Sequence, residues 1–342
     1  MSTLLTILAL VLAAVAIGQI VRIFELSNAI KGVDENEITD KDNDRQGWLM
    51  LLFMLAMLIG FTWMTIDYWD VMLPKSASAH GVDVDRLMSI SMIVIIAVFF
   101  VTQPLLFYFA FKYRGSKKKQ ADFISHNDKL ELIWTSIPAI VLAGLILYGL
   151  STWHEIMFEE PSEEPLVVEI YAKQFGWNAR YAGTDNQLGY ANVRNIEGVN
   201  ILGVDETDGA SLDDIVVGGE MHLPVNRPVV FKFRAQDVIH SAFLPHFRVQ
   251  MNCVPGAVTQ FKFTPTVTTA EMRQDPEVVE KVMGINELRM AKGEEPYEFD
   301  YVLLCNKICG SAHYNMQMKV VVESEEDFEN WLKGQKTFAE SL

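Results

Sequence analysis

Four long apolar runs constrain the fold of this chain more than any other feature of its sequence. They cover residues 3–21, 46–66, 87–111 and 132–153, and none of them contains a charged residue. A helix of about 20 apolar residues spans the roughly 30 Å hydrocarbon core of a bilayer, and it satisfies its own backbone hydrogen bonds there. We therefore predict four transmembrane helices.

The first run has an alternative interpretation. It could be a signal peptide, because residues 14–18 (A-V-A-I-G) are similar to a cleavage site. Residues 1–3 contain no lysine or arginine, however, and signal peptides carry positive charge in that position. We therefore expect the first run to be retained as a helix.

The charges of the connecting loops predict the orientation of the helices. The loop after the second run has few basic residues, namely Lys75 and Arg86. The loops after the first and third runs have more: Arg22, Lys31, Lys41 and Arg45 in one, and Lys112, Arg114, Lys117, Lys118, Lys119 and Lys129 in the other. Since basic loops stay in the cytoplasm, we expect a multi-pass protein of the cell (inner) membrane with both termini on the extracytoplasmic side.

The chain after residue 153 has a different composition. From His154 onward it holds 30 Asp plus Glu against 16 Lys plus Arg, which accounts for −14 of the total charge of −16. Short runs rich in β-branched residues, at 166–171, 229–233, 258–263, 301–304 and 318–322, predict the strands of a sandwich or barrel. This part should therefore be a folded domain outside the membrane.

Two inserts interrupt the predicted strands. Residues 183–214 are polar and rich in Asp and Gly, which predicts a long surface loop, and residues 269–292 predict one or two helices. Near the end, Ser324 and Asp327 resemble a capping box. The sequence contains no repeat, phosphate-binding loop or hydrolytic motif, and we expect no nucleic-acid partner.

Residues 305–316 (C-N-K-I-C-G-S-A-H-Y-N-M) bring four metal-binding side chains into one segment, namely Cys305, Cys309, His313 and Met316. Thiolates and a thioether favour Cu(I), and an imidazole accommodates the oxidised ion, so this set suits copper. A mononuclear blue-copper site uses one cysteine and two histidines, which leaves one cysteine too many. Both thiolates are used if they bridge two copper ions, each of which then needs a terminal imidazole.

His240, in D-V-I-H-S (residues 237–241), can supply the second imidazole. It follows a β-rich run at residues 228–234, which predicts that it lies in a loop at a strand end. A lone histidine in such a place is usually structural, and Met316 by itself would be a core residue. The combined spacing of these side chains favours ligands instead.

The cysteines leave one alternative open. Cys305 and Cys309 could form a disulfide, because a domain outside the cytoplasm favours oxidation. A disulfide would leave His313 and Met316 without a role. Cys253 has no ligand-like spacing to any other residue, and we expect it to be a buried free thiol.

These motifs resemble those of a known family. D-V-I-H-S, V-P-G (residues 254–256) and C-x-x-x-C-G-x-x-H-x-x-M are similar to subunit II of haem-copper cytochrome c oxidases, which carries the binuclear copper centre CuA. The resemblance extends from the apolar run before Trp134 to Phe328. It implies an α+β membrane protein with four transmembrane helices followed by an extracytoplasmic all-β cupredoxin-like Greek-key barrel.

The resemblance also implies a division into domains. The family has two membrane helices, so we expect an additional N-terminal helix pair at residues 1–66, the subunit II hairpin at 67–153 and the copper domain at 154–342. The additional pair, with an acidic linker at residues 34–40, is expected to provide a packing surface in the complex.

The same resemblance implies six ligands to two copper ions: the bridging thiolates of Cys305 and Cys309, the terminal imidazoles of His240 and His313, the thioether of Met316 and the backbone carbonyl of Lys307. The family usually has a glutamate at the position of Lys307, which helps to bind magnesium at the subunit interface, and often an aspartate at the position of Asn252. A lysine cannot ligate Mg²⁺, so a magnesium site is in doubt here.

The function that the resemblance implies is electron transfer. The chain would accept electrons from cytochrome c, or from a membrane-bound cytochrome c donor, and pass them to the haem of subunit I, where oxygen reduction drives proton pumping. Expected partners are subunit I, other oxidase subunits and the lipid bilayer. Phe175 and Trp177, in Q-F-G-W, are candidates for the point where electrons enter, and Glu131 is a candidate for proton uptake.

Two other functions share part of this pattern. A CuA component of a nitric or nitrous oxide reductase would share the copper motif but not the helix-hairpin pattern around Glu131, Trp134 and Pro138. A membrane-tethered copper chaperone needs exposed, exchangeable ligands, whereas the distant His240 indicates a fixed site. Quinol oxidases lack the two cysteines, and no C-x-x-C-H motif for haem c occurs in the chain.

Overall fold

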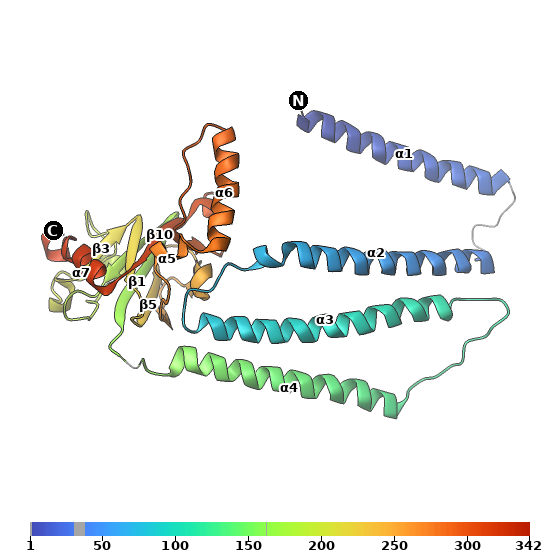
Figure 1. The fold of residues 1–342 in the computed structure, drawn as a ribbon, viewed down its shortest axis with the longest axis horizontal. Helices are drawn as coiled ribbons and strands as arrows, with labels where there is room; N and C mark the ends of the chain where they lie inside the picture. The colour runs from blue at the N-terminus through green and yellow to red at the C-terminus, as the bar shows by residue number, and fades with distance from the viewer. Residues whose placement is uncertain (1, 31–37, 162) are drawn as a thin grey trace. The chain divides into compact units, whose positions relative to one another are not determined.

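The computed structural model describes residues 2–30, 38–161 and 163–342 (Figure 1). Its first half consists of four long helices: α1 (Ser2–Ile30), α2 (Asp40–Met72), α3 (Gly81–Lys112) and α4 (Asp128–Phe158). All four are long and apolar enough to cross a membrane. Each predicted apolar run lies inside one of them, so the prediction of four spanning helices is confirmed. Residues 34–37 of the predicted acidic linker lie outside the described residues.

The chain forms two compact units, Met1–Asp67 with Val94–Glu131, and Tyr68–Ile93 with Leu132–Leu342. In the first unit, aromatic pairs join α2 to α3. The ring centroids of Trp48 and Phe111 lie 4.9 Å apart, and those of Phe61 and Phe99 lie 4.8 Å apart. The bilayer-spanning parts of these two helices therefore contact each other through aromatic side chains.

The second unit contains ten strands in two five-stranded sheets. The first sheet has the order β3-β2-β1-β5-β8, built from β1 (Leu166–Lys173), β2 (Gly176–Tyr181), β3 (Ile215–Gly218), β5 (Val229–Ala235) and β8 (Thr259–Phe263). The second has the order β4-β10-β9-β6-β7, built from β4 (Glu220–Pro224), β6 (His240–Leu244), β7 (Val249–Cys253), β9 (Tyr301–Cys305) and β10 (Gln317–Glu323). Two of the pairs are parallel, β1 with β5 and β4 with β10, and the others are antiparallel.

One apolar core holds the two sheets together. Alternate residues of β5 and β10 point into it, among them Phe231, Phe233 and Val320, which are fully buried. This alternation follows from the two-residue period of a strand. The predicted sandwich or barrel and all five predicted strands are confirmed. Strands β2, β3, β4, β6 and β7 were missed; burial does not alternate regularly along β2, β3, β4 and β6.

The two inserts have the predicted character. Residues 183–214 form a loop with two short 3-10 turns, but it is not purely a surface loop, since Leu202 and Val204 are buried in a small cluster with Phe338. Residues 269–292 contain two helices, α5 (Thr269–Met272) and α6 (Pro276–Ala291). The helix α7 (Glu325–Lys333) begins at Ser324, whose hydroxyl accepts a hydrogen bond from the backbone N–H of Asp327 at 3.1 Å.

The connector between α2 and α3 is bound to the barrel. The N–H of Ala77 donates to the carbonyl of His246 at 2.7 Å, and its own carbonyl accepts from Thr266 at 2.8 Å. The hydroxyl of Ser78, which is buried, donates to the carbonyl of Phe247 at 2.7 Å. These bonds connect the adjoining ends of α2 and α3 to the turn between β6 and β7 and to the end of β8.

Candidate metal centre

Strand pairing brings the two ligand segments together. β6 lies between β7 and β9, with His240 opposite Cys253 and Ala242 opposite Cys305. His240 is the first residue of β6 and is fully buried, so the prediction that it lies in a loop is wrong. Its position in the sheet follows from the hydrogen bonds of β6, and the backbone N–H of Asn306 extends the pairing by donating to the carbonyl of Ser241 at 2.9 Å.

Five side chains named by the sequence motif converge at the end of β9. The Sγ atom of Cys305 lies 3.8 Å from Nδ1 of His240 and 3.9 Å from Sγ of Cys309. The Sγ atom of Cys309 lies 3.6 Å from Nδ1 of His313 and 3.8 Å from Sδ of Met316. Among the described residues, the donor atoms of His240, Cys305 and Cys309 all lie within 4.8 Å of one another.

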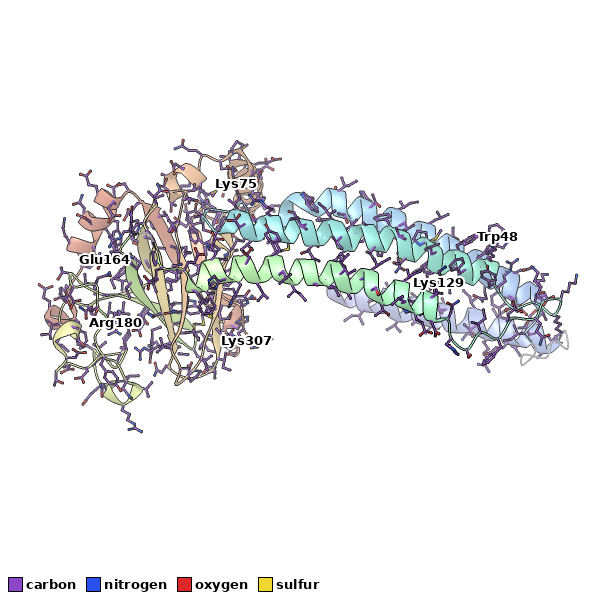
Figure 2. All side chains as sticks on the ribbon, turned by 90° about the horizontal axis from the view of Figure 1, so that it is seen from below. Trp48, Lys75, Lys129, Glu164, Arg180 and Lys307 are labelled. Carbon is purple, nitrogen blue, oxygen red and sulfur yellow. The ribbon has the colours of Figure 1, made fainter. Side chains whose placement is uncertain are left out.

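Lys307 contributes through its backbone and not through its side chain. Its carbonyl oxygen lies 3.2 Å from Sγ of Cys305, whereas the side chain is exposed. Figure 2 marks Lys307 on the surface of the barrel. Asn252, the other position that departs from the family pattern, is also exposed.

Most of the cluster is buried, and burial disfavours the charged form of its thiols. Cys305 is 9% exposed, Cys309 5% and Met316 1%, and His313 is half-buried. Burial, together with the neighbouring Cys305, raises the pKa of the Cys309 thiol to about 11. Two adjacent buried thiols ionise together only if a cation compensates their charge, which is the effect of a bound metal. The donor set of two thiols, two imidazoles and a thioether fits copper. The cysteines are free thiols, as is the buried Cys253, which confirms that prediction.

Asp237 contacts the candidate ligand His240, and we did not single it out from the sequence. Its Oδ1 atom lies 2.9 Å from Nε2 of His240, so the imidazole carries its proton on Nε2 and presents Nδ1 to Cys305. Burial opposes ionisation of Asp237, but hydrogen bonds from the N–H of Gln174 and from His240 outweigh it and hold its pKa below the ordinary value. A carboxylate behind a ligating histidine is a common outer-shell arrangement, and the D-x-x-H spacing was the signal for it.

The Q-F-G-W segment covers the ligand loop. The side-chain amide of Gln174 donates to the carbonyl of Cys309, and the indole N–H of Trp177 donates to the carbonyl of Met316 at 3.4 Å. The Trp177 ring is buried, with its centroid 6.2 Å from that of His240.

Phe175 is the aromatic residue of this segment that reaches the surface, with 37% of the residue exposed. It lies against Gly310, which adopts a φ of +141°. A Cβ atom at Gly310 would lie 2.8 Å from the Phe175 ring, so a side chain there would displace the ring. Glycine at position 310 therefore allows the aromatic ring to pack directly on the ligand loop.

Glu131 is not part of the metal cluster. It lies in the first turn of α4, is exposed, and its Oε1 atom accepts from the backbone N–H of Asn127 at 3.2 Å. This is a helix-capping contact.

Two family models match the chain. One, described as the transmembrane domain of cytochrome c oxidase subunit II, matches residues 66–152, and the other, described as its periplasmic domain, matches residues 166–290. The second match ends before Cys305 and the ligand loop.

Curated relatives match over most of the chain. The alternative cytochrome c oxidase subunit 2 of Bradyrhizobium diazoefficiens is 35% identical over 245 residues, which are 70% of this chain and 76% of the relative. Cytochrome c oxidase subunit 2 of Thermostichus vulcanus is 24% identical over 85% of this chain and 86% of that protein. A solved periplasmic domain of subunit II from Bradyrhizobium japonicum is 20% identical, with a TM-score of 0.31, and the match covers 52% of this chain and 96% of that structure.

Proposed function

Because this chain belongs to the cytochrome c oxidase subunit II family, we propose that it accepts electrons from cytochrome c at a binuclear copper centre and passes them to the haem of subunit I. As a family member it is a subunit of a haem-copper terminal oxidase, an oxidoreductase, and a membrane protein with an extracytoplasmic domain. Oxygen reduction and proton pumping would then take place in other parts of the complex.

One observation carries the binuclear proposal: each cysteine faces its own histidine. His240 lies beside Cys305 and His313 beside Cys309, while the two sulfur atoms lie between the imidazoles. One metal ion would not need two bridging thiolates with a separate imidazole at each end. Met316 and the carbonyl of Lys307 would hold the ions as the weaker donors, one for each ion.

Two copper ions bound here would supply a one-electron acceptor and donor with no open position for a substrate. The protein's contribution is to hold the ligands still and to keep water away. Asp237 orients His240, Trp177 holds the carbonyl of Met316, and Gln174 holds that of Cys309. A site whose ligands are fixed in this way suits electron transfer, and it does not suit a copper chaperone, which must release its metal.

We assign Phe175 as the contact for the electron donor. It is the exposed aromatic residue of the Q-F-G-W segment and packs on the ligand loop at Gly310, whereas Trp177 is buried beside His240. The domain from His154 onward carries a net charge of −14. A basic cytochrome c would be attracted to such a surface.

The experiment that tests this function uses the purified full chain loaded with copper. We expect two copper ions per chain by metal analysis, an EPR spectrum of an electron shared between them, and rapid reduction by ferrocytochrome c. One copper or one zinc ion per chain would overturn the binuclear proposal. A binuclear centre that ferrocytochrome c does not reduce would overturn the assignment of the donor while leaving the metal site intact.

A further inference from the structure

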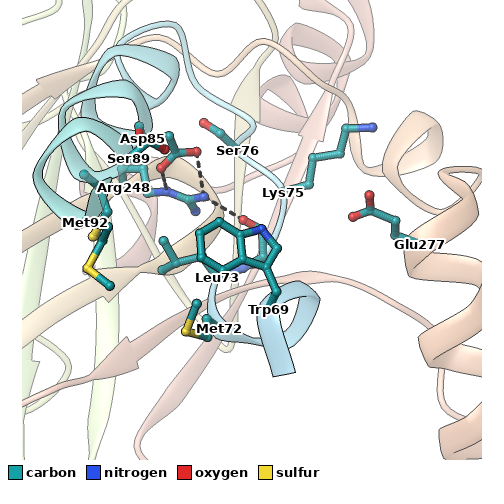
Figure 3. Close-up of a pocket in the computed structure, with 12 residues that line it drawn as sticks. Trp69, Met72, Leu73, Lys75, Ser76, Asp85, Ser89, Met92, Arg248 and Glu277 are labelled. Carbon is teal, nitrogen blue, oxygen red and sulfur yellow. Dashed lines mark hydrogen bonds and ion pairs between the residues drawn. The ribbon is translucent and has the colours of Figure 1, made fainter. Parts of the chain in front are cut away.

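A cavity of about 600 Å³ lies where α2 ends, α3 begins and the barrel contacts both (Figure 3). All of its lining residues belong to the same compact unit of the chain. Its apolar lining comes from the helix ends and their connector: Trp69, Met72, Leu73, Pro74, Met88 and Met92. The volume falls within the range of small-molecule sites, about 300–1,000 Å³.

One ion pair forms a wall of this cavity and is already satisfied within the protein. The guanidinium of Arg248 donates to both carboxylate oxygens of Asp85, at 2.7 and 2.9 Å, and to the carbonyl of Pro74 at 2.6 Å. The Arg248 side chain is 7% exposed. A bidentate pair of this kind needs no further partner, so the polar groups of a ligand would bind elsewhere.

Lys75 and Glu277 are the charged groups at the open side of the cavity. The Lys75 side chain is 52% exposed, and its ammonium pairs with Asp275. Glu277 lies in the first turn of α6 and is exposed. Figure 3 shows the ends of both side chains on the same side of the cavity, away from the methionines. They offer one cation and one anion to a ligand.

The position of the cavity indicates a ligand that comes from the membrane. The spans of α2 and α3 extend to Trp69 and from Gly81, so the apolar lining lies at the membrane boundary on the side of the extracytoplasmic barrel, where tryptophan is enriched. The apolar side chains come from the helix ends and the start of the connector, and the charged groups at the open side, Lys75 and Glu277, come from the connector and from α6. A phospholipid of the outer leaflet matches this arrangement, because its acyl chains lie among the membrane helices and its head group lies on the side of the barrel.

We propose that this cavity binds one zwitterionic phospholipid of the phosphatidylethanolamine type. The lining carries two cations, Lys75 and Arg248, and two anions, Asp85 and Glu277, and Asp275 pairs with Lys75, so the site has no net positive charge to attract an anionic head group. The phosphate would accept a hydrogen bond from Lys75, and the primary ammonium would donate to Glu277. A choline head group has no N–H to donate, so it would lose the second contact.

This assignment gives the end of α2 a role beyond packing. Trp69 and Met72 are 50% and 53% exposed in the chain alone. A bound acyl chain would cover both and would fill the joint that connects α2 to the barrel. The proposal is independent of electron transfer, since no copper ligand lines the cavity.

The first test fills the cavity. The oxidase complex that contains this chain would be stripped of bulk lipid with detergent, and the retained phospholipid would be counted by native mass spectrometry. We expect one retained phosphatidylethanolamine per complex, lost in Met92→Trp and kept in Ile93→Trp, whose side chain does not line the cavity. Copper content of both variants would show that the barrel is folded. A retained lipid in Met92→Trp, or none in the wild type, would overturn the proposal.

The second test addresses the head group, with the same complex incubated in vesicles of mixed phosphatidylethanolamine and phosphatidylglycerol. Glu277→Gln should reduce the preference for phosphatidylethanolamine about tenfold, the effect of one charge-assisted hydrogen bond. Glu280→Gln, on the same helix but outside the cavity, should leave it unchanged. A wild-type preference for phosphatidylglycerol would overturn the head-group assignment. Cross-linking of a photoreactive residue at position 69 to another oxidase subunit, and not to lipid, would overturn the proposal.

Discussion

His240 and Cys305 face each other, with Nδ1 of the imidazole 3.8 Å from the sulfur, across 65 residues of the chain. The contact depends on the pairing of β6 with β9, in which Ala242 lies opposite Cys305. A shift of this register by one residue would turn His240 to the other face of the sheet. The candidate metal centre therefore depends on the pairing of the second sheet as much as on the ligand loop.

Replacing one bridging cysteine should remove the binuclear centre. In Cys309→Ser we expect copper per chain to fall from two ions to one or none, because a serine hydroxyl is not a thiolate ligand. Cys253→Ala is the matched control, since that thiol is buried but lies outside the cluster, and it should keep both ions. Two coppers with an unchanged EPR spectrum in Cys309→Ser would contradict the bridging role.

Shortening Phe175 should slow electron acceptance and leave the copper in place. We expect Phe175→Ala to lower the rate of reduction by ferrocytochrome c about tenfold or more, because the exposed ring lies directly on the ligand loop and its loss lengthens the path for electrons. This corresponds to roughly 1.4 kcal/mol in the barrier. Phe175→Trp should retain most of the rate. Stopped-flow kinetics at equal copper content would make the comparison, and equal rates in all three proteins would contradict the assignment.

Association with the donor should weaken with salt. The domain from His154 onward carries −14, and interactions between exposed charges are screened beyond a Debye length of about 8–10 Å at 0.1–0.15 M salt. We expect the second-order rate of cytochrome c oxidation to fall steeply between low and physiological ionic strength. A rate that stays constant or rises would indicate apolar docking or a donor held permanently in the complex.

The role of Glu131 can be separated from that of the copper centre. If Glu131 collects protons for subunit I, Glu131→Ala should slow oxidase turnover where proton uptake limits the rate, while copper content and cytochrome c binding stay unchanged. Asp128→Ala is a matched control, because Asp128 is an exposed carboxylate in the same helix turn. Equal turnover in both variants would identify Glu131 as a solvated helix-end charge.

Asp214 should make the stability of the barrel depend on pH. It is fully buried, and burial raises its pKa to about 7 although Arg180 lies 3.0 Å away. An unfolded aspartate has a pKa near 3.8, so between pH 4 and 7 the folded state binds a proton that the unfolded state releases. The free energy of unfolding should therefore fall as pH rises through this window, by at most about 1.4 kcal/mol per pH unit, and level off above it.

The comparison with Asp214→Asn isolates this contribution from other titrating groups. Thermal unfolding of both proteins between pH 5 and 8 should show a difference in Tm, wild type minus variant, that decreases as pH rises to 7. A difference that is constant over this range would mean that Asp214 is ionised throughout, held by its ion pair with Arg180.

Local features of the sequence were enough to predict the helices and the candidate ligand loop. The four uncharged runs were enough to predict α1 to α4. A segment that crosses the hydrocarbon core needs about 20 apolar residues and must form its backbone hydrogen bonds within itself. The spacing of Cys305, Cys309, His313 and Met316 was enough to predict the candidate ligand loop, because these side chains come from one short segment. The helices in residues 269–292 followed from local pattern in the same way.

Only the tertiary structure decided which distant residues meet. Strand pairing between segments far apart in the chain places His240 in β6, where Asp237 contacts its ring. It also leaves Phe175 exposed and Trp177 buried. The cavity between Trp69 and Glu277 depends on how the connector binds to the barrel. Such contacts are set by sheet register and by packing of the whole core, which the residue pattern of a single segment does not encode.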